Sequence, residues 1–256
     1  MLNVPARHNA KLQALVEVIN ADEELAQFYR SANINAVDRA GINDHGEVHV
    51  QIVANAALRL LRLLVDAGIQ PSVVTDHGLD LDDAEVLVVL ASCLHDIGIA
   101  VHRDDHERYS LILAYPKARQ LLGQMYDEPA LTALVCDTLH AIIAHDAEQR
   151  CLTLEAGVVK VADALDMTQG RSRIPFEAGS LTIHSVSAQA VSSVSIEQGE
   201  ERPVRVVIKL SNSAGIFQVD ELLKRKLSNS TLAPYVEVVA SVEGEEERKL
   251  IGVYRL

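Results

Sequence analysis

An ionisable doublet stands where an apolar helix is expected to end, and this junction constrains the fold more than any other feature. The run AEVLVVLASC, residues 84–93, leads through Leu94 into His95 and Asp96. The acidic DLDD before it, residues 80–83, is typical of a helix start, because carboxylates there interact favourably with the helix dipole. A buried ionisable group is costly unless a partner neutralises it. We therefore expect a buried helix that ends with His95 in the core, beside something that neutralises Asp96.

Two more helical segments place a histidine on the side that periodicity assigns to the core. In residues 46–68, His49 is followed by apolar residues at offsets of 4, 7, 11 and 15, which is the repeat of one buried helix face. Residues 131–146 form a second apolar helix, which ends near His145. Both histidines are therefore expected to point into the protein.

A fourth segment, residues 154–170, contributes carboxylates. Asp163 and Asp166 are three positions apart and so occupy neighbouring positions on one face of the expected helix, which Gly170 would end. Helices that each present an imidazole or a carboxylate inward converge on the axis of a bundle, where uncompensated carboxylates are strongly destabilised. A divalent cation would neutralise them, and this donor set suits Fe, Mn, Zn, Co or Ni better than calcium.

The pattern changes after Pro175 from helical periodicity to short β-branched runs. We expect two domains, an all-α domain over residues 1–175 and a small α+β domain over residues 178–256 with the order ββ(β)αββ. The expected strands and the one helix of the second domain are the following: strands 180–187, 190–198 and 203–211, helix 215–227, and strands 235–243 and 249–256.

The composition limits the kinds of protein that the chain can be. It has 256 residues, 48% of them hydrophobic, which is enough for a full buried core. The net charge is −13, and residues 178–256 hold 9 basic and 10 acidic residues, so almost all of the excess lies before them. Broad contact with nucleic-acid phosphates needs a basic face and is not expected.

The cysteines and the N-terminus indicate where the protein resides. Cys93, Cys136 and Cys151 form no CxxC pair, so neither a disulfide framework nor a cysteine zinc site is expected. The N-terminus lacks the charged-then-apolar order of a signal peptide, and the longest apolar runs fall short of a membrane span. We therefore expect a cytoplasmic protein without membrane contact.

The order of the inward-facing residues resembles a known family. His49, the doublet His95-Asp96 within LHDIG, later histidines and Asp163 within VADALD resemble the H…HD…H…H…D signature of the HD-domain metal-dependent phosphohydrolases. The resemblance spans residues 40–173 approximately and implies an all-α HD fold. It also implies a first metal site, with Asp96 as the carboxylate that bridges two ions. The residues of that site are His49, His95, Asp96 and Asp163.

The histidines that precede Asp163 decide whether a second ion binds. The resemblance implies that His106, which opens a new helix, and His145 are ligands of that ion. His102 is the rival of His106, because the short gap after the doublet leaves either able to fold back. His140 and His145 differ by five positions, about 140° around a helix, so a straight helix does not point both at one ion. His140 is therefore interpreted as a packing residue or a contact of the substrate.

The resemblance implies a reaction as well as a site. Two divalent transition metal ions (Fe, Mn, Ni, Co or Zn, with Mg as a further candidate) about 3.5–4 Å apart would clamp phosphoryl oxygens and activate a water, with Asp96 as the catalytic carboxylate. The candidate donors to the leaving group are Arg103, Lys160, Arg171 and Arg173. Side chains expected near the substrate are His45, His102, His140, Arg171 and Arg173. Ordinary salt bridges are the alternative for the basic residues, and the favoured one for Lys160; a loop-capping role is the alternative for His45.

The expected substrate is a small phosphate ester, such as a nucleotide or a related phosphomonoester or phosphodiester. The chain lacks the GYP segment and HHE doublet of the cyclic di-GMP phosphodiesterases and the synthetase domain of the stringent-response hydrolases, so the substrate stays open. An HD-type di-iron oxygenase and a non-catalytic, metal-stabilised regulator that senses a ligand are the alternatives. The C-terminal domain is expected to be a regulatory, dimerisation or lid module, in a protein that forms a homodimer.

Overall fold

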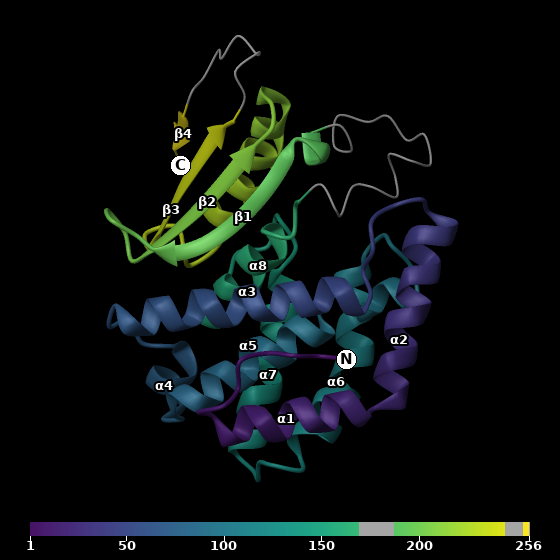
Figure 1. Cartoon of the computed structure of the whole chain (residues 1–256). Helices are drawn as coiled ribbons and strands as arrows, with labels where there is room; N and C mark the ends of the chain where they lie inside the picture. Colours follow the sequence, from purple (N-terminus) through teal and green to yellow (C-terminus); the bar gives the residue numbers. More distant parts are fainter. Residues whose placement is uncertain (169–186, 244–252, 256) are drawn as a thin grey trace.

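A bundle of helices forms the first part of the protein, and a small sheet with helices forms the second (Figure 1). The computed structural model describes residues 1–168, 187–243 and 253–255. The elements of the helical part are α1 (Ala10–Ala21), α2 (Glu23–Asn33), η1 (Ile34–Arg39), α3 (Glu47–Asp66), α4 (Ser72–His77), α5 (Leu81–Leu94), η2 (Ile97–Ala100), α6 (His106–Leu122), α7 (Ala130–Ala144) and α8 (Leu154–Ala164). The all-α character expected of this part is confirmed.

Helix α5 begins and ends where the sequence predicts. Asp80 caps it, because its carboxylate accepts a hydrogen bond from the backbone N–H of Asp83 at 3.0 Å, and the Asp83 carboxylate accepts one from the N–H of Asp80, also at 3.0 Å. This reciprocal capping box satisfies N–H groups that have no partner within the helix. His95 is the C-cap residue, and it is completely buried. The end of α5 therefore delivers the histidine–aspartate doublet into the core.

Helix α3 corrects one expectation. Within the described residues, it is long and apolar enough to cross a membrane by length and composition, whereas all apolar runs were expected to fall short. In the structure 56% of its most apolar window is buried, and the helix packs against α5 and α8. Its apolar face therefore belongs to the protein core. His49 lies on this face, in the first turn of the helix.

The C-terminal part is a mixed sheet whose strands match four of the predicted runs. Its elements are β1 (Val191–Gln198), β2 (Val204–Leu210), η3 (Ser213–Gly215), η4 (Gln218–Leu223), α11 (Lys224–Ser228), β3 (Val236–Val242) and β4 (Val253–Arg255). The strand order is β1-β2-β3-β4; β2 pairs in parallel with β3, and the other two pairs are antiparallel. The crossover between β2 and β3 contains the predicted helix. Nearly all of the predicted strand 180–187 lies outside the described residues.

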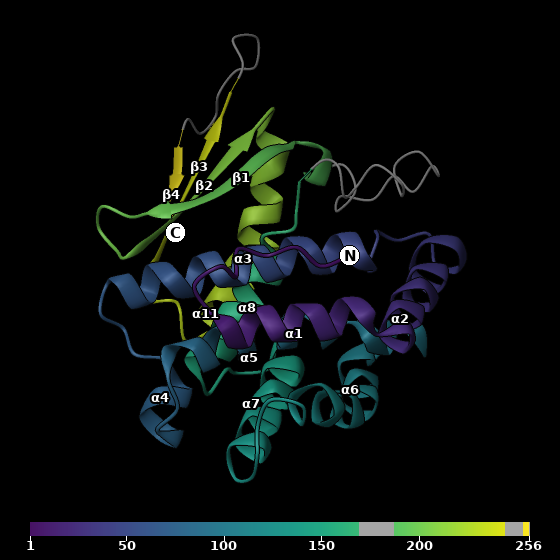
Figure 2. The same cartoon turned by 60° about the horizontal axis from the view of Figure 1, so that its bottom comes forward.

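The two parts pack against each other through one continuous core. Buried residues of α3 and α8 belong to the same apolar cluster as Val206 of β2 and Val238 of β3. The sheet lies over α3, as both views show (Figures 1 and 2), and α11 packs against α8, beside which it is labelled in Figure 2. The predicted boundary between residues 175 and 178 lies outside the described residues, so the division into two domains stays a prediction.

Candidate metal centre

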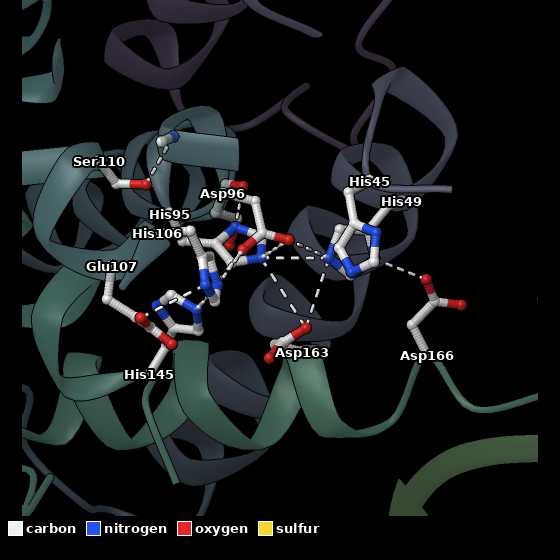
Figure 3. A network of polar contacts seen from close by, with 12 residues as sticks. His45, His49, His95, Asp96, His106, Glu107, Ser110, His145, Asp163 and Asp166 are labelled. Carbon is white, nitrogen blue, oxygen red and sulfur yellow. Dashed lines mark hydrogen bonds and ion pairs between the residues drawn. The ribbon is translucent and has the colours of Figure 1, made fainter. Parts of the chain in front are cut away.

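Ionisable side chains from separate helices meet at one point inside the helical part (Figure 3). His49 comes from the first turn of α3, His95 caps α5 and Asp96 follows it, His106 opens α6, His145 caps α7, and Asp163 lies in the last turn of α8. The five residues other than Asp163 are all buried, and the Asp163 side chain is 16% exposed. The structure therefore brings together all six residues that the sequence proposed as metal ligands.

Asp96 lies between two groups of imidazoles. Its Oδ2 is 3.2 Å from Nε2 of His49 and 3.3 Å from Nε2 of His95. Its Oδ1 is 3.1 Å from Nε2 of His106 and 3.5 Å from Nε2 of His145. We call His49, His95 and Asp163 the first half of the centre, and His106 and His145 the second half. Asp96 is shared by both halves.

Asp163 closes the first half. Its Oδ1 lies 3.4 Å from Nε2 of His49 and 3.8 Å from Nε2 of His95. Two carboxylates and two imidazoles thus surround one point, each with an atom that donates a lone pair. This set resembles the ligation of a first-row transition metal by nitrogen and oxygen.

The contact that Nδ1 of each ring makes outside the centre shows which ring nitrogen carries the proton. Nδ1 of His95 lies 2.8 Å from the carbonyl oxygen of Ser92, and Nδ1 of His145 lies 2.6 Å from that of Ile142. A carbonyl oxygen only accepts hydrogen bonds, so both Nδ1 atoms must be protonated. Neutral rings of this form present an unprotonated Nε2 to the centre.

The rings of His49 and His106 also turn Nδ1 towards a hydrogen-bond acceptor outside the centre. Nδ1 of His49 lies 2.6 Å from Oδ2 of Asp166. Nδ1 of His106 lies 3.0 Å from the carbonyl oxygen of Arg103 and 3.3 Å from Oε2 of Glu107. Metal-binding histidines usually donate their other N–H to a carboxylate or a backbone carbonyl, which fixes the orientation of the ring.

The inward nitrogens of the four rings face one another at close range. Nε2 of His49 is 3.1 Å from Nε2 of His95, and Nε2 of His106 is 3.3 Å from Nε2 of His145. When all four rings are neutral, each pair opposes two lone pairs in a buried place, which is unfavourable unless a cation or a proton lies between them. The donor set therefore fits a divalent metal ion in each half.

The carboxylates and imidazoles alter each other's pKa values. Burial alone would lower the pKa of His95, but Asp96 and Asp163 outweigh it and raise that pKa to about 9. Burial would raise the pKa of Asp96, yet His95 and the other imidazoles hold it well below its usual range. Burial lowers the pKa of His145. The two carboxylates thus stabilise a positive charge next to them, which in the metal-free protein is the protonated ring of His95.

Gly98 allows the second half to form. A Cβ atom at this position would lie 2.1 Å from the carbonyl oxygen of His106 and 2.3 Å from the backbone nitrogen of Ser110. The N–H of Gly98 donates to Oγ of Ser110 at 2.8 Å. The glycine of the LHDIG segment therefore lets the first turn of α6 approach η2 closely, and this approach places His106 beside Asp96.

The structure separates His106 from its rival, and it places Arg103 nearby. His102 is exposed, and its Nδ1 accepts a hydrogen bond from the backbone N–H of Asp104 at 3.0 Å. Arg103 is also exposed, with Nη1 2.8 Å from Nδ1 of His106. Because that Nδ1 already donates to a carbonyl oxygen, the guanidinium is a charged neighbour of the ring rather than its hydrogen-bond donor.

Two other proposed residues have partners away from the cluster. Nε2 of His140 accepts a hydrogen bond from the backbone N–H of Leu152 at 2.9 Å, which agrees with the angular argument that it points away from His145. Lys160 is completely buried, and its Nζ donates to the carbonyl oxygen of Gln149 at 2.5 Å. The Lys160 ammonium is thus held by a backbone carbonyl oxygen and not by the salt bridge that was the favoured alternative, while its contact with a leaving group stays a prediction.

The remaining substrate-side candidates are His45 and two arginines. Nδ1 of His45 lies 2.6 Å from the carbonyl oxygen of Asn43, and its ring lies tilted against that of His49 at 5.4 Å between centroids. His45 therefore shapes the loop before α3 and packs against a proposed ligand. Arg171 and Arg173 lie outside the described residues.

Two residues of the centre were not proposed as site residues from the sequence. Asp166 hydrogen-bonds His49, and Lys226 of α11 pairs with Asp163. Burial would raise the pKa of Asp163, but Lys226 and the two imidazoles of the first half hold it well below its usual range. The three-residue spacing of Asp163 and Asp166 was a signal for Asp166, whereas the only signal for Lys226 was its place in a helical run.

A helical bundle in which histidines and aspartates converge in this order defines an HD-type metal domain. Residues 49–168 match the HD domain family, and the chain belongs to that family. Its superfamily is of the metal-dependent phosphohydrolase type, and HD-domain proteins bind divalent metals.

A relative resembles this chain over most of its length. The chain is 43% identical over 225 residues to "Uncharacterized protein MJ1020" of Methanocaldococcus jannaschii, a match that covers 88% of this chain and 87% of the relative. A match of this length extends beyond residues 49–168, so the likeness includes part of the chain outside the HD domain match.

Proposed function

We propose that this protein hydrolyses a small phosphate ester with a centre of two divalent metal ions. The observation that carries this proposal is the position of Asp96, whose two carboxylate oxygens face two separate pairs of imidazole nitrogens. Such a carboxylate is suited to bridging two cations. The substrate class we favour is a nucleotide or a related phosphomonoester or phosphodiester.

Each half of the centre would hold one ion. The first would be held by His49, His95, Asp96 and Asp163, and the second by Asp96, His106 and His145. A bound pair of such ions polarises phosphoryl oxygens and lowers the pKa of a bound water towards neutrality. Candidate ions are Fe, Mn, Ni, Co and Zn, with Mg as a further candidate.

The protein's own residues would orient the ligands and exclude water. Asp166 and the carbonyl oxygens of Ser92, Ile142 and Arg103 fix the four rings. The nearly complete burial of the imidazoles excludes competing water and strengthens electrostatic interactions in the centre.

Arg103 is our candidate for contact with the phosphate. Its exposed guanidinium lies next to His106, and a guanidinium matches phosphate oxygens with two parallel hydrogen bonds. Arg171 and Arg173 stay predictions, as do the homodimer and the cytoplasmic location. The strongly acidic chain gives no support to an extended nucleic-acid partner.

Metal analysis combined with a screen of phosphate esters tests the proposal. Purified protein should contain about two transition metal ions per chain and should hydrolyse at least one nucleotide, cyclic nucleotide or sugar phosphate. Asp96→Ala should lose both the metal and the activity. Asp104→Ala, which removes an exposed carboxylate from the same segment, is the matched control and should retain both. Full metal content in Asp96→Ala would contradict the site.

The same preparation distinguishes the two other functions. Iron, a mixed-valence EPR signal and oxygen uptake with a candidate substrate would favour a di-iron oxygenase, whereas hydrolysis supported by Mn²⁺ or Mg²⁺ would count against it. Tight binding of one compound without turnover across the whole panel would favour a metal-stabilised regulator.

A further inference from the structure

A lysine from the C-terminal part reaches the metal centre. Nζ of Lys226, in α11, pairs with Oδ2 of Asp163, a residue 63 positions earlier in the chain. The Lys226 side chain is 19% exposed, whereas Lys224 and Arg225 beside it are 50% and 57% exposed. Of these three consecutive basic residues, Lys226 is thus the one turned inward.

This contact divides the two oxygens of Asp163 between two tasks. Oδ1 lies 3.4 Å from Nε2 of His49 and faces the first half of the centre. Oδ2 is held by Lys226. A carboxylate whose outer oxygen is fixed in this way has little freedom to rotate its inner oxygen out of position.

The chain around Lys226 is attached to the connection between α7 and α8. We call residues 225–232 the docking segment. Its Asn229 accepts a backbone hydrogen bond from Cys151 at 3.1 Å and donates one from Nδ2 to the carbonyl oxygen of Ala147 at 2.8 Å. Oγ1 of Thr231 donates to the carbonyl oxygen of Thr153 at 3.0 Å.

That connection links two proposed ligands. His145 lies immediately before it, and Asp163 lies on the helix that follows it. Gly157 of this helix packs so closely on the docking segment that a Cβ atom would lie 2.2 Å from Oγ1 of Thr231. The docking segment therefore contacts the centre through its one inward lysine and also braces the backbone between two ligands.

We propose that Lys226 is a positioning residue of the first metal site, through which docking of the C-terminal part and binding of the first ion favour each other. This inference rests on the proposed metal centre. Lys226 holds Asp163 in the orientation that the ion needs, and the ion in turn fixes Asp163 as the partner of Lys226. Coupling of this kind is reciprocal, so each event must strengthen the other by the same factor.

Metal affinity in three variants tests the first direction of the coupling. Lys226→Met removes the charge and the hydrogen bond but keeps most of the side-chain volume. Lys226→Arg keeps a cation and N–H donors, and Lys224→Met is the control on the same helix, where Lys224 pairs with Asp220 at 2.8 Å. Each variant is made in the His106→Ala background, in which the first half of the centre is intact, and is titrated with Mn²⁺ by calorimetry.

We expect Lys226→Met to bind the ion about 10–100-fold more weakly, as is usual when a partner of a metal ligand is lost. Lys226→Arg should restore most of the affinity, and Lys224→Met should match the background. Unchanged or tighter binding in Lys226→Met would overturn the proposal, because the lysine would then act only as a nearby charge that repels the cation.

Hydrogen exchange tests the reverse direction. Adding Mn²⁺ to the chain with native Lys226 should slow amide exchange in the docking segment, and Lys226→Met should lose this effect while its β2 and β3 amides stay protected. Equal slowing in both proteins would overturn the proposal. The result is separable from the proposed function, because metal content and phosphate ester hydrolysis of the unmodified protein are measured independently.

Discussion

The two halves of the metal centre are built in different ways. In the first half, His49 and Asp163 depend on residues far away in the chain, since Asp166 orients one and Lys226 holds the other. In the second half, each ring donates to the carbonyl oxygen three residues earlier, Arg103 for His106 and Ile142 for His145. Distant partners therefore hold two of the three residues of the first half, whereas both rings of the second half, like His95, are oriented by a carbonyl oxygen three residues earlier.

This difference suggests that the halves can be disabled separately. Helices α3, α5 and α8, which carry the first half, all pack on one another, so this half is embedded in the main core. The second half is placed by the first residue of α6 and the residue after α7. Changes to distant partners should affect the first ion, and changes to the backbone near α6 should affect the second.

The largest effect should come from removing one ring from each half in turn. Losing only the partner of a ligand typically costs 10–100-fold in metal affinity, so losing the ligand itself should cost more than about 100-fold. His49→Ala should therefore abolish the first ion and His106→Ala the second, each leaving close to one metal ion per chain by elemental analysis. Loss of both ions from either variant would show that the halves are not separable.

A methyl group at Gly98 should break the second half through the backbone alone. Gly98→Ala would force its Cβ against the carbonyl oxygen of His106 and the backbone nitrogen of Ser110. We expect a loss of about 1–3 kcal/mol of stability in chemical denaturation, typical of overpacking, with displacement of His106. The second ion should be lost and the first retained. Gly41→Ala is a poor control, because Gly41 has a positive φ that alanine rarely adopts, so Ala100→Gly is the control variant.

Neutralising Asp166 should weaken the first half without touching a ligand. In Asp166→Asn the side-chain oxygen still accepts from Nδ1 of His49, but the charge that makes the imidazole a stronger ligand is gone. We expect the first ion to bind about tenfold more weakly in a competition titration with a fluorescent chelator. The second ion should bind as before, and Asp104→Asn should change neither.

The pH dependence of metal affinity, about tenfold for each pH unit, should distinguish the two halves by the protons that they release. The pKa of His95 is raised from 6.5 to about 9, so an ion entering the first half displaces a proton at neutral pH. Its affinity should rise with pH up to about 9 and then level off. Burial lowers the pKa of His145, so its ring is already neutral and contributes no such rise. Calorimetry in buffers of different ionisation enthalpy counts the released protons.

Rising pH should lower the folding stability of the metal-free protein, although it raises the affinity for the first ion. Because the folded pKa of His95 is raised, the stability that its protonated form contributes to the metal-free protein is fully present below pH 6.5 and is lost as the pH rises through about 9. Protein treated with a chelator should therefore melt at a lower temperature at the high end of this range, whereas metal-loaded protein should show a smaller change. A chelated protein that grows more stable over this range would contradict the raised pKa.

The inward directions of His49 and His95 were predictable because short-range rules apply to them, whereas the choice of His106 over His102 rested on the resemblance to the family. The helical repeat assigns His49 to a buried face, and the apolar run before His95 requires that helix to end inside the protein. The five-residue separation of His140 and His145 excludes one of them from the centre by angle alone. In each case a local rule fixes the direction in which the side chain points.

The remaining parts depend on features that local rules do not contain. The expected helix over residues 154–170 ends at Ala164, so Asp166 lies beyond the helix, where it hydrogen-bonds His49. Lys226 lies in an amphipathic run whose docking partner is set by tertiary packing. Lys160 shows the converse. Its place one turn before Asp163 suggested a role in the metal centre, but its Nζ donates a hydrogen bond to the carbonyl oxygen of Gln149.

The position of Lys226 in the chain has a consequence for the order of events during biosynthesis. All six proposed ligands have been synthesised once residue 163 is complete, whereas the lysine that covers the outer oxygen of Asp163 follows 63 residues later. Domains fold from the N-terminus during synthesis. The C-terminal part can therefore dock over α8, and Lys226 can pair with Asp163, only after all six proposed ligands have left the site of synthesis.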